Sequence, residues 1–129
     1  MKKEKVCVHA AKLGDLELLS QLYSDGYPLT KRAAYVAAQS GHIDILQWLR
    51  DKSIFWNGNV CDEKVAKIAI EAGHLPVVQW VVRHGIAVTW WMVVASIRSH
   101  NIQMVDWTWT WFKGTRAVNS IVNNSKKVV

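Results

Sequence analysis

The sequence predicts an all-α solenoid of about four two-helix repeats, because one residue pattern recurs along the chain. In three copies a glycine separates an alanine-rich helical stretch from a second apolar one. Corresponding apolar anchors follow one another at steps of 27, 32 and 27 residues. A pair of apolar residues and, in three copies, a tryptophan keep the same register. The anchors are Leu16, Ile43, Leu75 and Ile102.

The second copy shows how the pattern predicts two helices. Thr30 is an N-cap residue type whose hydroxyl can accept a backbone N–H at the start of a helix. Small alanines follow and allow a neighbouring helix to approach closely. Gly41 ends this helix, because glycine readily adopts the left-handed conformation of a C-cap. From Ile43 to Leu49, apolar residues at helical period then predict the second helix.

The whole chain, residues 1–129, is expected to form one repeat domain. Counting 11 residues back from Gly73 gives Asp62, another N-cap residue type, so the longer step contains an extra segment. Such an insertion between repeats often maps to a binding face. The polar C-terminal stretch suits the end of a solenoid. We therefore expect repeats at residues 4–26, 30–53, 62–85 and 89–113, a loop insertion at 57–61 and a capping helix at 115–125.

The fourth copy departs from the others at two places. His100 stands where the other copies have glycine. Tryptophan and threonine alternate from Trp107 to Trp111, and a period of two is typical of a strand. The register of the repeat favours a helix, in which Trp107 and Trp111 share a face and Trp109 points away.

The net charge of +6 is not spread evenly along the chain. Residues 6–112 contain nine Lys or Arg and nine Asp or Glu, whereas residues 1–5 carry +2 and residues 113–129 carry +4. A duplex-binding domain usually concentrates its cations on a folded face, and charge runs at chain ends are usually solvated. Nucleic-acid binding is therefore not the expected function.

No targeting segment or membrane span is expected. The most apolar run, residues 86–97, has 12 residues, and a span needs about 20. Cys7 and Cys61 lack the spacing of a disulfide framework or zinc site, and two buried thiols indicate a reducing compartment. We expect an intracellular, cytoplasmic, monomeric protein with no metal and no cofactor.

The pattern A-A-x-x-G-H-Φ-x-Φ-Φ-x-W-Φ, where Φ is apolar, resembles the ankyrin repeat over residues 6–112. The match is best at residues 37–49 and 69–81, and the tryptophans resemble short variants from large DNA viruses and some protists. A viral protein would act in the host cytoplasm. The usual unit has about 33 residues and opens with T-P-L-H, which no copy here has. The long β-hairpin finger is therefore expected to be missing, which leaves the helical part of the family's contact surface.

No catalytic residues are predicted, because the sequence has none of the nucleophile, zinc-protease or phosphate-loop motifs. His42 and His74 occupy the same repeat position. A hydrogen bond within the repeat geometry explains such a recurrence better than a metal or catalytic role. Cys61 and His74 also show no recognisable metal-site spacing.

The tryptophans divide into core and exposed candidates. Trp48, Trp80 and Trp107 recur at one position and are expected to pack between repeats, as is Trp56 in its turn. Trp90 and Trp91 are adjacent on one predicted helix, so both cannot face the same core, and Trp109 is a further candidate for exposure. Exposed aromatic residues often anchor an interface.

The resemblance also implies a binding surface. In the ankyrin family the two variable residues before the glycine lie on the concave, ligand-facing side. The resemblance thus implies protein–protein binding through this face, although plain solvent exposure explains the same variation. Alternatives are nucleic-acid or anionic-surface binding through the basic ends, and a fragment of a longer array. The expected partner-binding residues are Lys12, Tyr27, Gln39, Glu71, Trp90 and Arg98.

Overall fold

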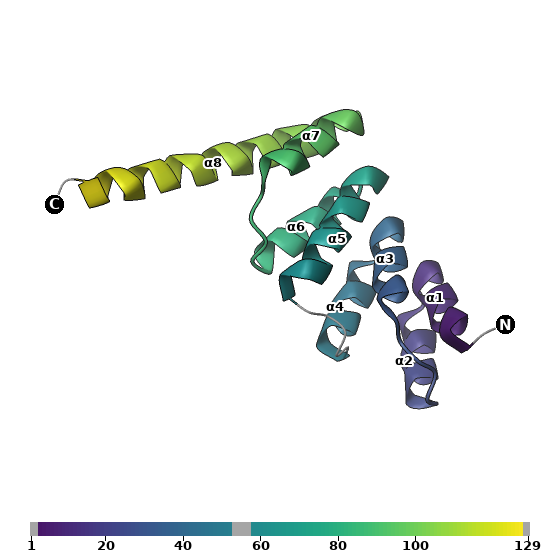
Figure 1. The fold of residues 1–129 in the computed structure, drawn as a ribbon. Helices are drawn as coiled ribbons and strands as arrows, with labels where there is room; N and C mark the ends of the chain where they lie inside the picture. Colours follow the sequence, from purple (N-terminus) through teal and green to yellow (C-terminus); the bar gives the residue numbers. More distant parts are fainter. Residues whose placement is uncertain (1–2, 53–57, 128–129) are drawn as a thin grey trace.

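The computed structural model describes the backbone of residues 3–52 and 58–127, and this part of the chain is a succession of helices without a strand. Four consecutive helix pairs confirm the predicted all-α repeat architecture (Figure 1). The helices are α1 (Lys3–Leu13), α2 (Leu16–Ser24), α3 (Lys31–Ser40), α4 (Ile43–Lys52), α5 (Gly58–Ala72), α6 (Leu75–Arg83), α7 (Trp90–Arg98) and α8 (Ile102–Lys127).

The pairs stack into a solenoid with two layers. The first helices α1, α3, α5 and α7 each contact the next first helix, and α4 contacts α6 in the second layer (Figure 1). Within each repeat the two helices also contact one another. Each repeat therefore buries its apolar surface against its neighbours, as a helical solenoid requires.

Small side chains form the contact between first helices. In α3 the alanines fill the buried side completely, and α1 and α5 place alanine against it as well. Because a methyl group is short, the backbones of neighbouring helices can lie close together. The fully or nearly fully buried alanines are Ala10, Ala11, Ala33, Ala34, Ala37, Ala38, Ala66 and Ala69.

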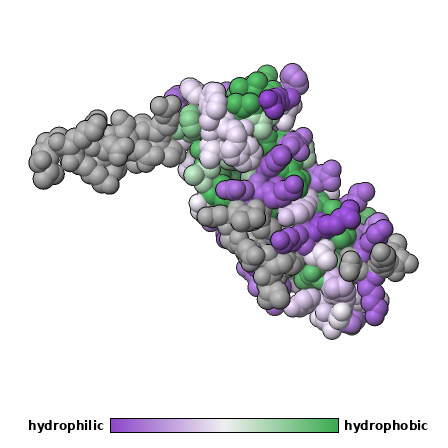
Figure 2. Space-filling model, in the orientation of Figure 1, coloured by the Kyte–Doolittle hydropathy of each residue, from purple (hydrophilic) through white to green (hydrophobic). Residues whose placement is uncertain are grey.

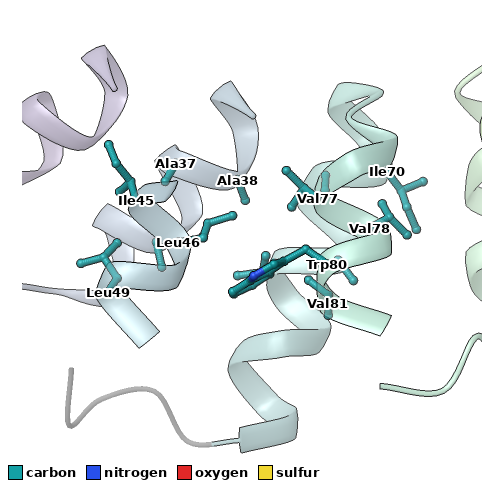
Figure 3. Packing of buried hydrophobic residues seen from close by; sticks show 14 of the residues in the cluster. Ala37, Ala38, Ile45, Leu46, Leu49, Ile70, Val77, Val78, Trp80 and Val81 are labelled. Carbon is teal, nitrogen blue, oxygen red and sulfur yellow. The ribbon is translucent and has the colours of Figure 1, made fainter. Parts of the chain in front are cut away.

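Larger side chains fill the space between second helices. Leu46 of α4 and Val77 of α6 are buried in this layer, and Trp80 lies between the two helices (Figure 3). The Trp80 Nε1–H donates to Oε1 of Gln47 at 3.0 Å, so the one polar atom of the ring has a partner. Trp80 is buried as predicted.

The other tryptophans of this register are less deeply buried. Trp48 and Trp107 are half-buried and pack against the core, which agrees with the predicted packing role. Trp107 also lies 5.4 Å from Trp111, centroid to centroid, so these two share a helix face. The interpretation of residues 107–111 as helix rather than strand is thus confirmed, whereas Trp56 lies outside the described residues.

The turns inside the repeats use one backbone conformation. Gly14, Gly41 and Gly73 have φ values of +78°, +79° and +80°, in the left-handed region that glycine adopts without a steric penalty. Gly41 is the C-cap of α3, as expected. His100 adopts the same region with a φ of +56°, so the fourth repeat keeps the turn at the expense of backbone strain.

The expected loop insertion at residues 57–61 is wrong for residues 58–61, which belong to α5. α5 has 15 residues, against 10 in α3, so the added segment lengthens a first helix at its N-terminal end. Asp62 consequently lies inside this helix and is not its N-cap. Helix propagation explains the difference, since each added residue gains a backbone hydrogen bond once a helix exists. Residue 57 lies outside the described part.

The capping helix expected at residues 115–125 is not a separate element. α8 runs through Gly114 without a break for 26 residues, so these residues form its C-terminal half. Figure 1 shows this half extending well beyond α7. The one glycine at this point does not end the helix, because its φ is not in the left-handed region.

The helix caps differ in part from the expectation. Thr30 is the N-cap of α3, as predicted, but its side chain makes no capping hydrogen bond. Two of the second helices, α2 and α8, have side-chain caps: Oδ1 of Asp15 accepts from the Leu18 N–H and Oδ1 of Asn101 accepts from the Met104 N–H, both at 3.0 Å, whereas His74 does not cap α6 with its side chain. Second helices start directly after a tight turn, which brings a short polar side chain close to the free N–H groups.

Candidate functional site

The first helices α1, α3, α5 and α7 each present one side to solvent. Together these sides form one surface, which consists of residues at equivalent positions of the repeats. Along α1 it carries the residues at positions i, i+3, i+4 and i+7, which lie on one helix face. The corresponding residues of α3, α5 and α7 follow at the repeat steps of 27, 32 and 27. We call this surface the helical face. It consists of Lys5, Val8, His9, Lys12; Arg32, Tyr35, Val36, Gln39; Lys64, Lys67, Ile68, Glu71; and Trp91, Val94, Ala95, Arg98.

Three hollows indent the helical face, one between each pair of neighbouring first helices. Their volumes are about 790 Å³ between α1 and α3, 390 Å³ between α3 and α5, and 670 Å³ between α5 and α7. Arg32 and Val36 line both the first and the second, and Glu71 lines both the second and the third. The hollows therefore join into one shallow, continuous groove.

The floor of this groove is mainly apolar. Val36 of α3, Ile68 of α5 and Ala95 of α7 occupy one equivalent position and are half-buried. Tyr35 lies beside them and packs against the core. These side chains keep part of their apolar surface accessible to a ligand at the bottom of the groove.

One edge of the groove carries cations. Lys5, Arg32 and Lys64 occupy the first of the four equivalent positions, and all three are exposed. The Lys64 Nζ lies over the Tyr35 ring, 6.0 Å from its centroid, so this cation borders the floor. Trp91, which is 40% exposed, takes the same position on α7. We call Lys5, Arg32 and Lys64 the cationic edge.

The opposite edge carries the residues predicted from the sequence. Lys12, Gln39, Glu71 and Arg98 are the last of the equivalent positions in each repeat, and every one is exposed. The structure brings all four onto one surface, where each lines at least one hollow. We call these four residues the mixed edge, since they carry both signs of charge.

Positive charge is concentrated on the first helices of the first two repeats. α1 carries Lys3, Lys5 and Lys12 against Glu4, and α3 carries Lys31 and Arg32 without an acid. Among the described residues that line the hollow between these two helices there is no Asp or Glu. Acidic residues lie around the second-layer helix α2, at Asp15, Glu17 and Asp25, and on the first helix α5, at Asp62, Glu63 and Glu71.

Aromatic side chains close the groove at its α7 end. Trp90, a predicted binding residue, is 54% exposed and lines the third hollow together with Trp91. Both of these adjacent tryptophans are exposed, where at least one was expected. The ring of Trp90 also lies 5.6 Å from Phe112 and 6.3 Å from Trp109 of α8, and Trp109 is 43% exposed, as anticipated. Figure 2 shows paler side chains over α7 and the start of α8, and hydrophilic ones along α3 and α5.

Tyr27 is the predicted site residue that the structure does not bring to the groove. It precedes α3, is half-buried and packs against the hydrophobic core. It is not among the described residues that line the three hollows. A tyrosine in this turn contributes to packing between repeats.

The two recurrent histidines hold neighbouring repeats together. Nε2 of His42 lies 3.2 Å from the Lys12 carbonyl oxygen, and Nε2 of His74 lies 2.9 Å from that of Gln39. In the fourth repeat Asn101 takes this place, where its Nδ2–H donates to the Gly73 carbonyl oxygen at 3.4 Å. The interpretation of these histidines as part of the repeat geometry is therefore confirmed.

Among the described residues, no group of three His, Cys, Asp or Glu side chains could hold a metal ion. Cys7 is fully buried in the core, and burial raises the pKa of its thiol. No helix in the described ranges has both the length and the apolar character that crossing a bilayer requires.

The cationic edge and Trp91 complete the surface but were not among the predicted binding residues. Their spacing in the sequence repeats that of the anchors, so the signal was present. It is visible only when equivalent positions of the first helices are compared. Residues 6–112 taken together are neutral, because nine acidic residues, three of them on α5 itself, offset the nine cations.

Most of the repeat region of the chain matches a known protein family. The family described as ankyrin repeats (three copies) matches residues 7–89, which is more than half of the chain. No curated protein and no solved structure matches the chain. Ankyrin repeats are generally protein–protein interaction modules and typically lack catalytic activity. The matched residues run from within α1 to the residue before α7 and so cover most of the first three helix pairs, and the chain belongs to the ankyrin repeat family.

Proposed function

We propose that this chain is a non-catalytic module that binds a partner protein along the groove of the helical face. One observation carries the proposal. The core positions of the repeat hold small or apolar side chains in every copy, whereas the exposed mixed edge changes between cationic, amide and acidic side chains at Lys12, Gln39, Glu71 and Arg98. A constant scaffold with a variable, indented surface supports recognition of one specific partner.

The make-up of the groove favours a protein over a nucleic acid as the partner. Its floor presents Tyr35, Ile68 and Val94 as accessible apolar surface, and Trp90 and Trp91 stand at one end. Exposed aromatic residues beside a partly apolar pocket are typical anchors of protein interfaces.

The experiment is affinity capture of partners with a groove variant and a matched control. The groove variant replaces the mixed edge, with Lys12→Ala, Gln39→Ala, Glu71→Ala and Arg98→Ala. The control removes the same four residue types from the second layer: Lys52→Ala, Gln21→Ala, Glu17→Ala and Arg83→Ala, all at exposed positions. Circular dichroism must show both variants helical. We expect the intact chain and the control to retain the same proteins and the groove variant to lose them.

Equal retention by the groove variant would contradict the proposal and move the interface to another surface. Equal loss in both variants would indicate non-specific adhesion rather than binding in the groove.

We further propose that the chain acts as a monomer in the cytoplasm. A fully buried, reduced Cys7 in the core is compatible with that reducing compartment. Light scattering coupled to gel filtration tests the monomer directly.

A further inference from the structure

We propose that the cationic edge binds an acidic, extended segment of the partner protein, with carboxylates about three residues apart. This inference rests on the proposed function and adds the chemistry and spacing of the partner. It follows from the edge's charge, its regular placement and the apolar floor beside it. The other edge, with Glu71 among its members, does not share this charge.

Structural need does not explain the cations at the start of α3. Arg32 and its neighbour Lys31 lie in the first turn of α3, where the helix macrodipole favours acidic side chains and disfavours basic ones. Both are exposed, and the described lining of the adjacent hollow holds Lys5 and Lys12 but no acidic side chain. Their positive charges are therefore not offset within this hollow, and an anionic ligand would offset them.

The repeat sets the spacing of the ligand's charges. Lys5, Arg32 and Lys64 occupy equivalent positions on three first helices that pack in succession. Neighbouring helices lie about 8–10 Å apart. A polyproline II segment rises about 3.1 Å per residue and has three residues per turn, so side chains on one side recur about every 9 Å. An acidic residue at every third position would therefore meet successive cations.

The floor and the α7 end define the rest of the segment. Between its acidic residues, the segment would place apolar side chains against Val36 and Ile68. At α7 the cationic position is replaced by Trp91, with Trp90 next to it, which favours an apolar or aromatic residue there. Three helix steps of about 9 Å span roughly 27 Å, or about nine residues at 3.1 Å each.

Synthetic peptides test the spacing. The first is a fluorescent peptide of about ten residues with Glu at every third position, Leu and Ala between and Trp at one end. A second has the same composition with its Glu residues contiguous, and a third has Gln in place of Glu. Anisotropy titrations use the intact chain, a Lys5→Gln/Arg32→Gln variant and a matched Lys52→Gln/Arg83→Gln control that loses the same charge from the second layer.

We expect the spaced peptide to bind the intact chain about three- to tenfold more tightly than the contiguous one, the range that two or three exposed ion pairs can supply. The Gln peptide should bind more weakly than both. Lys5→Gln/Arg32→Gln should weaken binding of the spaced peptide about three- to tenfold and remove its advantage, while the control stays within about twofold. Raising the salt concentration should reduce the same advantage, because exposed charges are screened.

Equal affinity for the spaced and contiguous peptides would overturn the inference, as would equal weakening in the two variants or no binding at about 1 mM. Preferential binding of a thymidine oligonucleotide or a phosphatidylserine vesicle, lost in Lys5→Gln/Arg32→Gln, would overturn it in favour of those ligands. If the mixed-edge variant loses its captured partner but no acidic spacing is preferred, the proposed function stands and only this inference fails.

Discussion

The imidazole of His74 lies 2.9 Å from the main-chain carbonyl oxygen of Gln39, which precedes it by 35 residues. This contact joins the turn of the third repeat to the last turn of α3, one repeat earlier. The carbonyl belongs to a C-terminal turn of a helix, where oxygens lack an intrahelical partner. A side chain from the next repeat thus satisfies it and fixes the stacking distance between repeats.

His74→Ala should lower the free energy of unfolding by about 1–2 kcal/mol, from the lost hydrogen bond and the unpaired oxygen. His74→Asn should lower it less, because Asn101, at the equivalent position of the next repeat, also donates to a main-chain carbonyl oxygen of the preceding repeat, that of Gly73. Urea unfolding followed by circular dichroism measures both. Equal losses for the two variants would show that the hydrogen bond is not the source of the stabilisation.

The same histidine position constrains the glycine of the preceding turn. A Cβ added to Gly14 would lie 2.6 Å from Cε1 of the His42 ring, in addition to the strain of a φ of +78°. Gly26, with a φ of +91°, has open space around the corresponding position. Gly26→Ala should therefore cost about 1–2 kcal/mol from the backbone alone, and Gly14→Ala clearly more. Comparable costs in urea unfolding would mean that His42 moves aside freely.

The helix order and the turns could be predicted from the sequence because both arise from local rules that recur. In each copy small residues, a turn and an apolar stripe follow one another at fixed distances. Gly41 has the positive φ that the turn requires, and Trp80 is buried as the apolar stripe predicts. The start of α5 and the continuity of α8 could not be predicted. Helix propagation extends α5 back to Gly58 and carries α8 through Gly114, and the period of the apolar residues does not report how far a helix propagates.

The position of the mixed edge was predictable for a similar reason, since its residues precede the recurrent turn in each copy. The cationic edge was not found because Lys5, Arg32 and Lys64 are distant in sequence and become neighbours only when the first helices stack. Tyr27 was misplaced because an aromatic residue in a turn can pack inward as readily as outward. Burial in such a turn depends on the neighbouring repeat.

Cys7 should be unreactive in the folded protein and should make stability sensitive to high pH. It is fully buried, and burial raises the pKa of its thiol above the ordinary value of about 8.5. Folding thus favours the neutral thiol. Its contribution to the free energy of unfolding is complete below the pKa of Cys7 in the unfolded chain and is lost as the pH rises through the pKa of Cys7 in the folded protein.

A Cys61→Ser background leaves Cys7 as the only thiol. Ellman's reagent should then label it at neutral pH only when urea unfolds the chain. In the same background, Cys7→Ala should flatten the loss of stability above about pH 9. Rapid labelling under native conditions would contradict a core position for this side chain.

His100→Gly should stabilise the protein, although it removes a side chain. His100 is exposed and is the one described non-glycine residue with positive φ, at +56°, where the three preceding repeats have glycine. Relief of left-handed strain gains about 1–2 kcal/mol, and the greater freedom of glycine in the unfolded chain offsets up to about 1 kcal/mol of it. Thermal unfolding should therefore show a higher melting temperature, and His100→Ala, which keeps the Cβ, should show no such gain. A destabilised His100→Gly variant would mean that the imidazole makes a favourable contact that outweighs the backbone strain.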